Sequence, residues 1–186
     1  MKKKVNVNKM LMHISFIIYL IILVWIIGFK FNAQWLPEIG AYFRAMPLMD
    51  RVGKNIIPFY DMYENGIYFS ADYFMNVIIY IPLGIYLLFV GRNKSKYIIS
   101  FMIVAISSVL FELIQLVTGF GGCDGSDFVC NVIGGLIGIL LYCLVLKKLS
   151  LKVINIINVI VIIIFFPLAC YAFINTILNL HLYKIY

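Results

Sequence analysis

Apolar side chains follow one another along this chain in five long stretches, each separated from the next by polar or charged residues. A helix needs about 17–25 mostly apolar residues to cross the hydrocarbon core of a bilayer. The pattern predicts transmembrane helices at residues 10–29, 73–90, 97–117, 128–146 and 153–178. We therefore expect an all-α fold, a polytopic helical bundle that forms a single integral membrane domain over residues 1–186.

The distribution of lysine and arginine predicts how this bundle is oriented. Basic residues gather before the first span, between the second and third, and between the fourth and fifth. The positive-inside rule places these three segments, and with them the N-terminus, in the cytoplasm. The segment between the third and fourth spans has no basic residue and carries Asp124 and Asp127, so we expect it to face outward. The long segment 30–72, rich in aromatic residues and proline, is predicted to lie on the outer membrane surface.

Composition agrees with a membrane protein that has the lipid bilayer as its surroundings. Hydrophobic residues make up 64% of the chain, against about 45–50% in soluble domains. The net charge of +7 does not indicate a nucleic-acid partner, because the basic residues form no folded polar face. The four cysteines form no CxxC pair and have no neighbouring histidine, so we expect no metal site and no cofactor. Cys123 and Cys130 leave two alternatives open, a disulfide or free thiols at a helix start.

Several polar residues stand near the predicted outer ends of the helices. Glu112 and Gln115 share a helix face, and so do Asp127 and Asn131, because residues three or four apart are neighbours on a helix. The glycine-rich hairpin "GFGGCDG" lets these two faces approach each other. We predict a ligand-binding pocket formed by Asn55, Asn76, Glu112, Gln115, Asp124, Asp127 and Asn131.

Each of these residues also has a structural interpretation. Asp124 and Asp127 are suited to cap the fourth helix and to complement its dipole. Asn131 is suited to bond to a neighbouring helix. Glu112 fits a purely structural role least well, since a carboxylate in hydrocarbon costs roughly 2.5 kcal/mol or more. We expect it to be paired, protonated or in contact with water.

Two features predict how the helix backbones behave. Pro82 removes a backbone hydrogen bond from the second helix and leaves a carbonyl in need of a partner. Gly134 and Gly138 have the GxxxG spacing that is typical of close helix packing.

The order of the segments "KNIIPF", "NVIIYIPLG", "FELIQ" and "DGSDFVCNVIGG" resembles the VanZ-like family of bacterial membrane proteins. That family is named for a protein associated with resistance to the glycopeptide teicoplanin. The resemblance covers roughly residues 10–146, without the fifth span. Its most specific part is E-x-x-Q followed by D-x-x-D-x-x-x-N-x-x-G, supported by N-x(5)-P-x-G; these are Glu112, Gln115, Asp124, Asp127, Asn131, Gly134, Asn76, Pro82 and Gly84.

The chain departs from the family pattern at two places. The family often has an arginine shortly after the glutamine, where this chain has Gly119 and Phe120. Ser126 stands where a second acid often precedes the later aspartate. Without that arginine, either the ligand differs from that of the relatives or another cation takes its place, the candidates being Arg44, Arg51 and Lys54.

The resemblance implies a role at the outer face of the bacterial plasma membrane, in the cell envelope and in glycopeptide tolerance. The leading hypothesis is a non-enzymatic protein that binds an amphiphile, either the acylated glycopeptide antibiotic or a lipid-linked wall precursor. The alternative is an intramembrane enzyme that acts on a lipid-linked envelope substrate, with Glu112 and Asp127 as acid and base or as ligands of a divalent metal. Binding is favoured because no candidate nucleophile accompanies these acids. Coupled transport would call for charged groups near the bilayer midplane and an internal repeat, and neither is visible.

Overall fold

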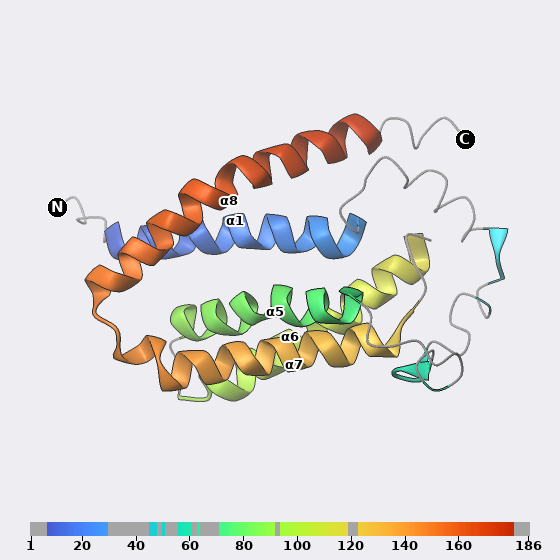
Figure 1. Cartoon of the computed structure of the whole chain (residues 1–186), viewed down its shortest axis with the longest axis horizontal. Coiled ribbons are helices and arrows are strands. Elements are labelled where there is room, and N and C mark those ends of the chain that lie inside the picture. The colour runs from blue at the N-terminus through green and yellow to red at the C-terminus, as the bar shows by residue number, and fades with distance from the viewer. Residues whose placement is uncertain are drawn as a thin grey trace.

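The structure, a computed structural model, describes residues 7–29, 45–47, 50, 56–60, 63, 71–91, 94–118 and 123–180. Within these residues, long helices run along a common direction (Figure 1). They are α1 (Val7–Phe29), α5 (Ala71–Val90), α6 (Lys96–Thr118), α7 (Gly125–Leu144) and α8 (Leu151–Leu180). A 3-10 helix, η3 (Leu146–Lys148), connects α7 to α8, and the described residues contain no strand. The predicted all-α fold is confirmed.

In the described part of the chain, five helices are long and apolar enough to cross a membrane, which confirms the predicted number of spans. Helix α1 begins at Val7 rather than at residue 10, and α7 begins at Gly125 rather than at residue 128. Asp124 explains the earlier start of α7, because its carboxylate oxygen Oδ1 accepts a hydrogen bond of 2.7 Å from the backbone N–H of Ser126. An aspartate at this position satisfies one of the free N–H groups of the first turn and fixes the helix start.

Helices α5, α6 and α7 pack together as a three-helix unit, in which α5 and α7 lie side by side (Figure 1). A Cβ atom added to Gly138 would lie 2.0 Å from the carbonyl oxygen of Ile81, and one added to Gly134 would lie 2.1 Å from that of Val77. The two backbones are therefore in direct contact, and any side chain at either glycine would push them apart. The close packing predicted from the GxxxG spacing is confirmed.

Helices α1 and α8 form a second unit, the α1–α8 pair, which lies across the top of the bundle in Figure 1. Two polar contacts join them within otherwise apolar surfaces. Ser15 Oγ donates to Asn158 Oδ1 over 2.8 Å, and Asn155 Nδ2 donates to Asn8 Oδ1 over 2.7 Å. Apolar packing between the same helices comes from Ile18, Ile22 and Ala169.

The α1–α8 pair meets the three-helix unit through α1. Tyr19 on α1 donates its hydroxyl hydrogen to the backbone carbonyl of Ile79 on α5 over 2.8 Å. Pro82 lies inside α5 and has no N–H for the carbonyl of Ile78, so the turn that receives Tyr19 is the turn that proline weakens. Tyr19 thus bonds to the carbonyl next to the one that proline leaves free, and an outside partner for the carbonyl of Ile78 stays a prediction.

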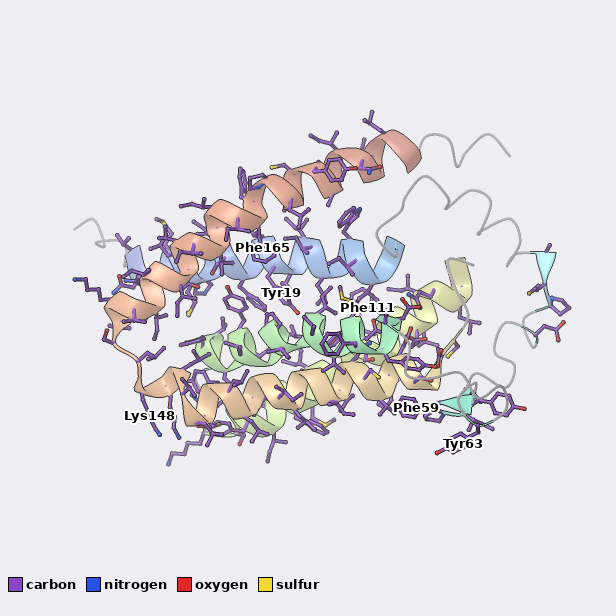
Figure 2. The ribbon with its side chains drawn as sticks, viewed as in Figure 1. Tyr19, Phe59, Tyr63, Phe111, Lys148 and Phe165 are labelled. Atoms are coloured by element: carbon purple, nitrogen blue, oxygen red, sulfur yellow. The ribbon has the colours of Figure 1, made fainter. Side chains whose placement is uncertain are left out.

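Basic and acidic side chains lie at opposite ends of the bundle. In Figure 2 the label Lys148 marks the first of these ends and the label Phe59 marks the second. One end, which we call the basic end, carries the described lysines Lys9, Lys94, Lys96, Lys147, Lys148 and Lys152. The other, which we call the acidic end, carries Asp72, Glu112, Asp124 and Asp127. This separation is what the positive-inside rule requires of a protein whose basic end is cytoplasmic, and the orientation itself stays a prediction.

Candidate functional site

Glu112 is buried near the acidic end of α6, with 4% of its surface exposed. Its Oε2 accepts a hydrogen bond of 2.8 Å from the backbone N–H of Asp124, the residue that caps α7. The carboxylate therefore holds the chain at the point where it enters α7. A charged acceptor gives a backbone N–H a stronger bond than a neutral one does, and this helps to offset the cost of burial.

Asp127 lies one turn into α7 and is 9% exposed. Its Oδ1 accepts a hydrogen bond of 2.6 Å from Asn76 Nδ2 on α5. The first turn of a helix also favours a negative charge, because the free backbone N–H groups point toward it. Asn76 and Asp127 thus connect α5 to the start of α7, as the predicted convergence of these residues requires.

A second polar layer lies one helical turn deeper in the bundle. Asn131 Nδ2 on α7 donates to Ser108 Oγ on α6 over 3.0 Å, and both side chains are almost fully buried. Tyr80, one turn below Asn76 on α5, has its hydroxyl 3.5 Å from Ser107 Oγ, at the limit of a hydrogen bond. Asn131 Oδ1 is buried and has no hydrogen-bond partner among the described residues.

Gln115 makes a contact that its sequence position did not predict. Its Nε2 donates to the backbone carbonyl of Ile27 over 2.8 Å, in the last turn of α1. Carbonyls in the last turn of a helix have no partner within that helix, so the amide of Gln115 satisfies one of them. Although Glu112 and Gln115 are three residues apart, the first bonds to the start of α7 and the second to the end of α1. A role of Gln115 in binding stays a prediction.

The N-terminus of α7 is covered by a short segment, residues 56–59, that belongs to the predicted "KNIIPF" motif. Phe59 donates its backbone N–H to Ser126 Oγ over 2.9 Å, and its ring packs edge-on against Tyr73 at 5.5 Å. Its φ of 60° lies in the left-handed region, which is costly for a residue with a side chain. A Cβ atom on Gly125 would lie 2.3 Å from the carbonyl oxygen of Ile56, so only glycine fits beneath this segment.

Part of the predicted site lies outside the described residues. This applies to Asn55, to the candidate counter-ions Arg44, Arg51 and Lys54, and to hairpin residues 119–122. The other six predicted residues lie at the acidic end on α5, α6 and the start of α7, and we call them the polar cluster: Asn76, Glu112, Gln115, Asp124, Asp127 and Asn131.

The two cysteines beside the cluster, Cys123 and Cys130, are both free, which decides between the two alternatives left open by the sequence. Burial, and then the nearby charges of Glu112 and Asp124, raise the pKa of the Cys123 thiol above its usual value. Such a thiol is protonated near neutral pH and is a poor nucleophile. No three His, Cys, Asp or Glu side chains in the described ranges are arranged to hold a metal ion.

The sequence profile of the VanZ/LLP1 family matches residues 16–147 of this chain. The chain belongs to this family. The Protein VanZ of Enterococcus faecium is 30% identical to it over 135 residues, which are 73% of this chain and 75% of that protein. No solved structure gives a significant match. The resemblance inferred from the motifs is confirmed, and the matched range holds the whole described polar cluster, whereas α8 lies beyond it.

In this VanZ/LLP1 member, sequence reasoning missed two serines that take part in the cluster. Ser108 bonds to Asn131, and Ser126 receives the backbone N–H of Phe59. The position of Ser108 contained a usable signal, because it lies one helical turn from Glu112 within an apolar span. Ser126 was noted only as a departure from the family pattern, although an N-terminal serine next to a capping aspartate commonly bonds to nearby backbone groups.

Proposed function

We propose that this protein binds an amphiphile at its acidic end, at the outer face of the bacterial plasma membrane, and thereby increases tolerance of glycopeptides such as teicoplanin. The amphiphile is the acylated antibiotic itself or a lipid-linked wall precursor. One observation carries this proposal: polar side chains from α5, α6 and α7 converge on the N-terminus of α7 within an otherwise apolar bundle.

Burial of so many polar groups in a membrane protein is costly, and such groups usually mark functional positions. The hydrogen bonds at Asn76, Glu112 and Asp127 hold the side chains in fixed positions, which reduces the ordering cost when a ligand binds. Asn131 Oδ1 offers a buried acceptor that a ligand donor would satisfy. Phe59, which covers the start of α7, has a left-handed backbone conformation, and strained backbone of this kind is common at ligand sites.

The hydrogen bonds of Glu112 and Asp127 favour binding over catalysis. Glu112 holds the backbone of Asp124, and Asp127 holds the amide of Asn76, so both contribute to the helix arrangement. The thiol of Cys123 has a raised pKa and is a weak nucleophile. His13, the histidine within the described ranges, is on the first turns of α1 at the basic end.

The orientation that this proposal needs can be tested with single cysteines in a cysteine-free background. Tyr63, at the acidic end in Figure 2, is 82% exposed, and Ser95 is exposed at the basic end. In intact cells, a membrane-impermeant maleimide should label Tyr63→Cys and should label Ser95→Cys only after permeabilisation. The opposite pattern would place the polar cluster in the cytoplasm and would end the proposal.

The function is tested by the minimum inhibitory concentration of teicoplanin in a susceptible Gram-positive host, at protein levels matched by immunoblot. Wild type should raise this concentration above that of the empty vector. Asp127→Asn keeps an acceptor for Asn76 but removes the charge, so it should reduce tolerance only partly. Complete loss with Asp127→Asn would instead favour a catalytic acid, for which losses of about 10² or more in rate are typical.

Asp72→Asn is the matched control, because Asp72 is an exposed acid on the first turn of α5 and takes no part in the hydrogen bonds described above for the cluster residues. It should behave like wild type. Equal inhibitory concentrations for wild type and empty vector would contradict a role in glycopeptide tolerance. Native mass spectrometry of the purified protein with teicoplanin then separates direct drug binding from binding of an endogenous lipid.

A further inference from the structure

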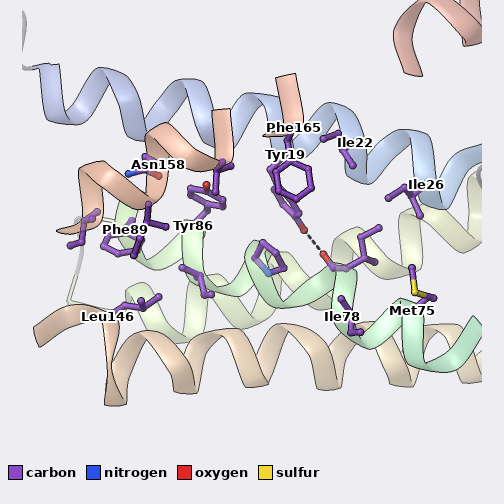
Figure 3. Close-up of a pocket in the computed structure, with 16 residues that line it drawn as sticks. Tyr19, Ile22, Ile26, Met75, Ile78, Tyr86, Phe89, Leu146, Asn158 and Phe165 are labelled. Atoms are coloured by element: carbon purple, nitrogen blue, oxygen red, sulfur yellow. Dashed lines mark hydrogen bonds between the residues drawn. The ribbon is translucent and has the colours of Figure 1, made fainter. Parts of the chain in front are cut away.

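A long apolar crevice of about 430 Å³ runs between α1, α5 and α8 (Figure 3), and no residue of the polar cluster lines it. It lies where the α1–α8 pair faces the three-helix unit. Its walls include Tyr19 on α1, Met75, Pro82 and Phe89 on α5, Leu146 on η3 and Val161 on α8.

The dimensions of the crevice suit one hydrocarbon chain. From Met75 to Phe89 along α5 it extends over roughly 21 Å, at about 1.5 Å per helical residue. One leaflet of the hydrocarbon core is about 15 Å deep, so a single acyl chain fits along this length. The volume is within the range of about 300–1,000 Å³ that small-molecule pockets show.

Two polar groups on the crevice wall, the hydroxyl of Tyr19 and Oδ1 of Asn158, are engaged with the protein. Tyr19 donates its hydroxyl hydrogen to the carbonyl of Ile79, and Asn158 Oδ1 accepts from Ser15 Oγ. The surface that remains is formed mainly by aliphatic and aromatic side chains. Such a surface recognises hydrocarbon and gives no place for a polar head group along its length.

Charge distinguishes the two ends of the crevice. At the basic end its walls include Phe89 and Leu146 (Figure 3), and Ile154 near the start of α8. Lys147 and Lys148 follow Leu146 directly in η3, and Lys152 lies on the first turn of α8; all three are exposed.

The opposite limit of the crevice lies at Met75 on α5, three residues after Asp72 and next to Asn76, which bonds to Asp127. A phosphate head group is attracted to the lysines and repelled by these carboxylates.

We propose that this crevice is a lipid site that holds one acyl chain of an anionic phospholipid, whose head group lies on Lys147, Lys148 and Lys152. This site is separate from the amphiphile site of the proposed function, because it is entered from the basic end. In the predicted orientation the lipid belongs to the cytoplasmic leaflet, where anionic lipids attract basic segments.

The test is native mass spectrometry of the full chain in mild detergent, titrated with dioleoylphosphatidylglycerol or dioleoylphosphatidylcholine. The two lipids have the same chains, so only the head group differs. Wild type should bind one phosphatidylglycerol at least fivefold more tightly than phosphatidylcholine. Equal affinity for the two lipids would overturn the proposal.

Variants at the lysines test the head-group contact. The triple variant with glutamine at residues 147, 148 and 152 should bring the affinity ratio of the two lipids close to one. The matched variant with arginine at the same residues keeps the charge and should keep the preference. A preference that survives the glutamine substitutions would place the head group elsewhere and contradict the proposal.

Variants in the wall test the chain contact. Val161→Trp fills the crevice from α8 and should weaken the binding of both lipids at least fivefold. Ile160→Trp adds the same side chain at a neighbouring exposed residue that does not line the crevice, and should bind like wild type. Ile85→Phe fills the crevice from α5 and serves if Val161→Trp does not fold, as judged by circular dichroism and gel filtration.

Unchanged lipid binding in a folded crevice-filling variant would overturn the proposal. The proposal would also be overturned if Met75→Trp abolished lipid binding while the lysine substitutions had no effect. The lipid would then enter the crevice from the acidic end. These results are independent of teicoplanin tolerance, so failure of the lipid site and failure of the proposed function are distinguishable.

Discussion

The three-helix unit and the α1–α8 pair are both built from apolar helices, but they are held together by different contacts. In the three-helix unit, Gly134 and Gly138 let the backbones of α5 and α7 touch, and buried polar groups connect its helices at the acidic end. In the α1–α8 pair, Ser15 bonds to Asn158, Asn155 bonds to Asn8, and apolar side chains fill the rest of the contact. Most of the surface of α8 is exposed.

The difference follows from the membrane as a solvent. Lipid chains are as apolar as leucine, so apolar side chains alone do not select a partner helix. Small residues select one by allowing close van der Waals contact, and polar side chains select one by hydrogen bonding. The unit that uses both kinds of contact carries the candidate site and lies within the family match, whereas α8 lies beyond that match.

The comparison predicts that the largest effect comes from the glycine contact. In Gly138→Leu, the new Cβ atom would lie 2.0 Å from the carbonyl oxygen of Ile81. This oxygen belongs to the backbone of α5, so it cannot rotate away as a side chain could. The cost should exceed the roughly 1–3 kcal/mol that is typical of overpacking, with loss of folded protein. Fluorescence-detected gel filtration measures this. Leu140→Phe, on the exposed face of α7, is the control and should leave a normal monodisperse peak.

The next effect concerns the polar contact between α5 and α7. Asp127→Ala leaves the amide of Asn76 without its acceptor, and loss of a hydrogen bond to a charged group costs roughly 1.5–3 kcal/mol. Thermal unfolding in detergent should therefore show a clear decrease in stability. Asp127→Asn keeps an acceptor at this position and should lose less. If the two variants unfolded alike, charge rather than hydrogen bonding would explain the contact.

A smaller effect is expected within the α1–α8 pair. The hydrogen bond between Ser15 and Asn158 is the kind of contact that averages about 0.6 kcal/mol in membrane proteins. A double-mutant cycle of Ser15→Ala and Asn158→Ala, followed by unfolding, should give a coupling energy of about that size. A coupling above about 2 kcal/mol would show that the α1–α8 pair depends on polar contacts as strongly as the three-helix unit does.

The smallest effect concerns electrostatics at the acidic end. Because the pKa of Cys123 is raised, its thiolate fraction at neutral pH is below that of an ordinary thiol. The rate of maleimide labelling of Cys123 should therefore still increase with pH above pH 9. Glu112→Gln removes one of the charges that raise this pKa, so labelling near neutral pH should become faster, by less than about tenfold. Asp72 is not among the charges that raise this pKa, so Asp72→Asn should change nothing. If Cys123 in the wild-type protein were labelled with the pH profile of an unperturbed thiol, the predicted effect of Glu112 on its pKa would be contradicted.

Local chemistry explains why much of the fold could be predicted. A membrane span depends on the hydropathy of about 20 consecutive residues, and this can be recognised without knowing any partner. The start of α7 depends on Asp124 and Ser126, which are two residues apart. The contact at Gly138 was predicted because GxxxG places two small residues on one helix face, although the sequence did not name α5 as the helix that packs there.

The sequence by itself determined the five spans and the gathering of polar residues near the acidic end, and it named Asp124 and Asp127 as candidate caps of α7. Only the tertiary structure decided which groups meet: that Gln115 bonds to the end of α1, that Ser108 bonds to Asn131, and that a crevice separates α8 from α5. The physical reason is that α8 is apolar on all sides, and an apolar helix face fits lipid and protein alike. Its position is set by a few hydrogen bonds between residues about 150 positions apart, such as that of Asn155 with Asn8, and such long-range pairs leave no local pattern in the sequence.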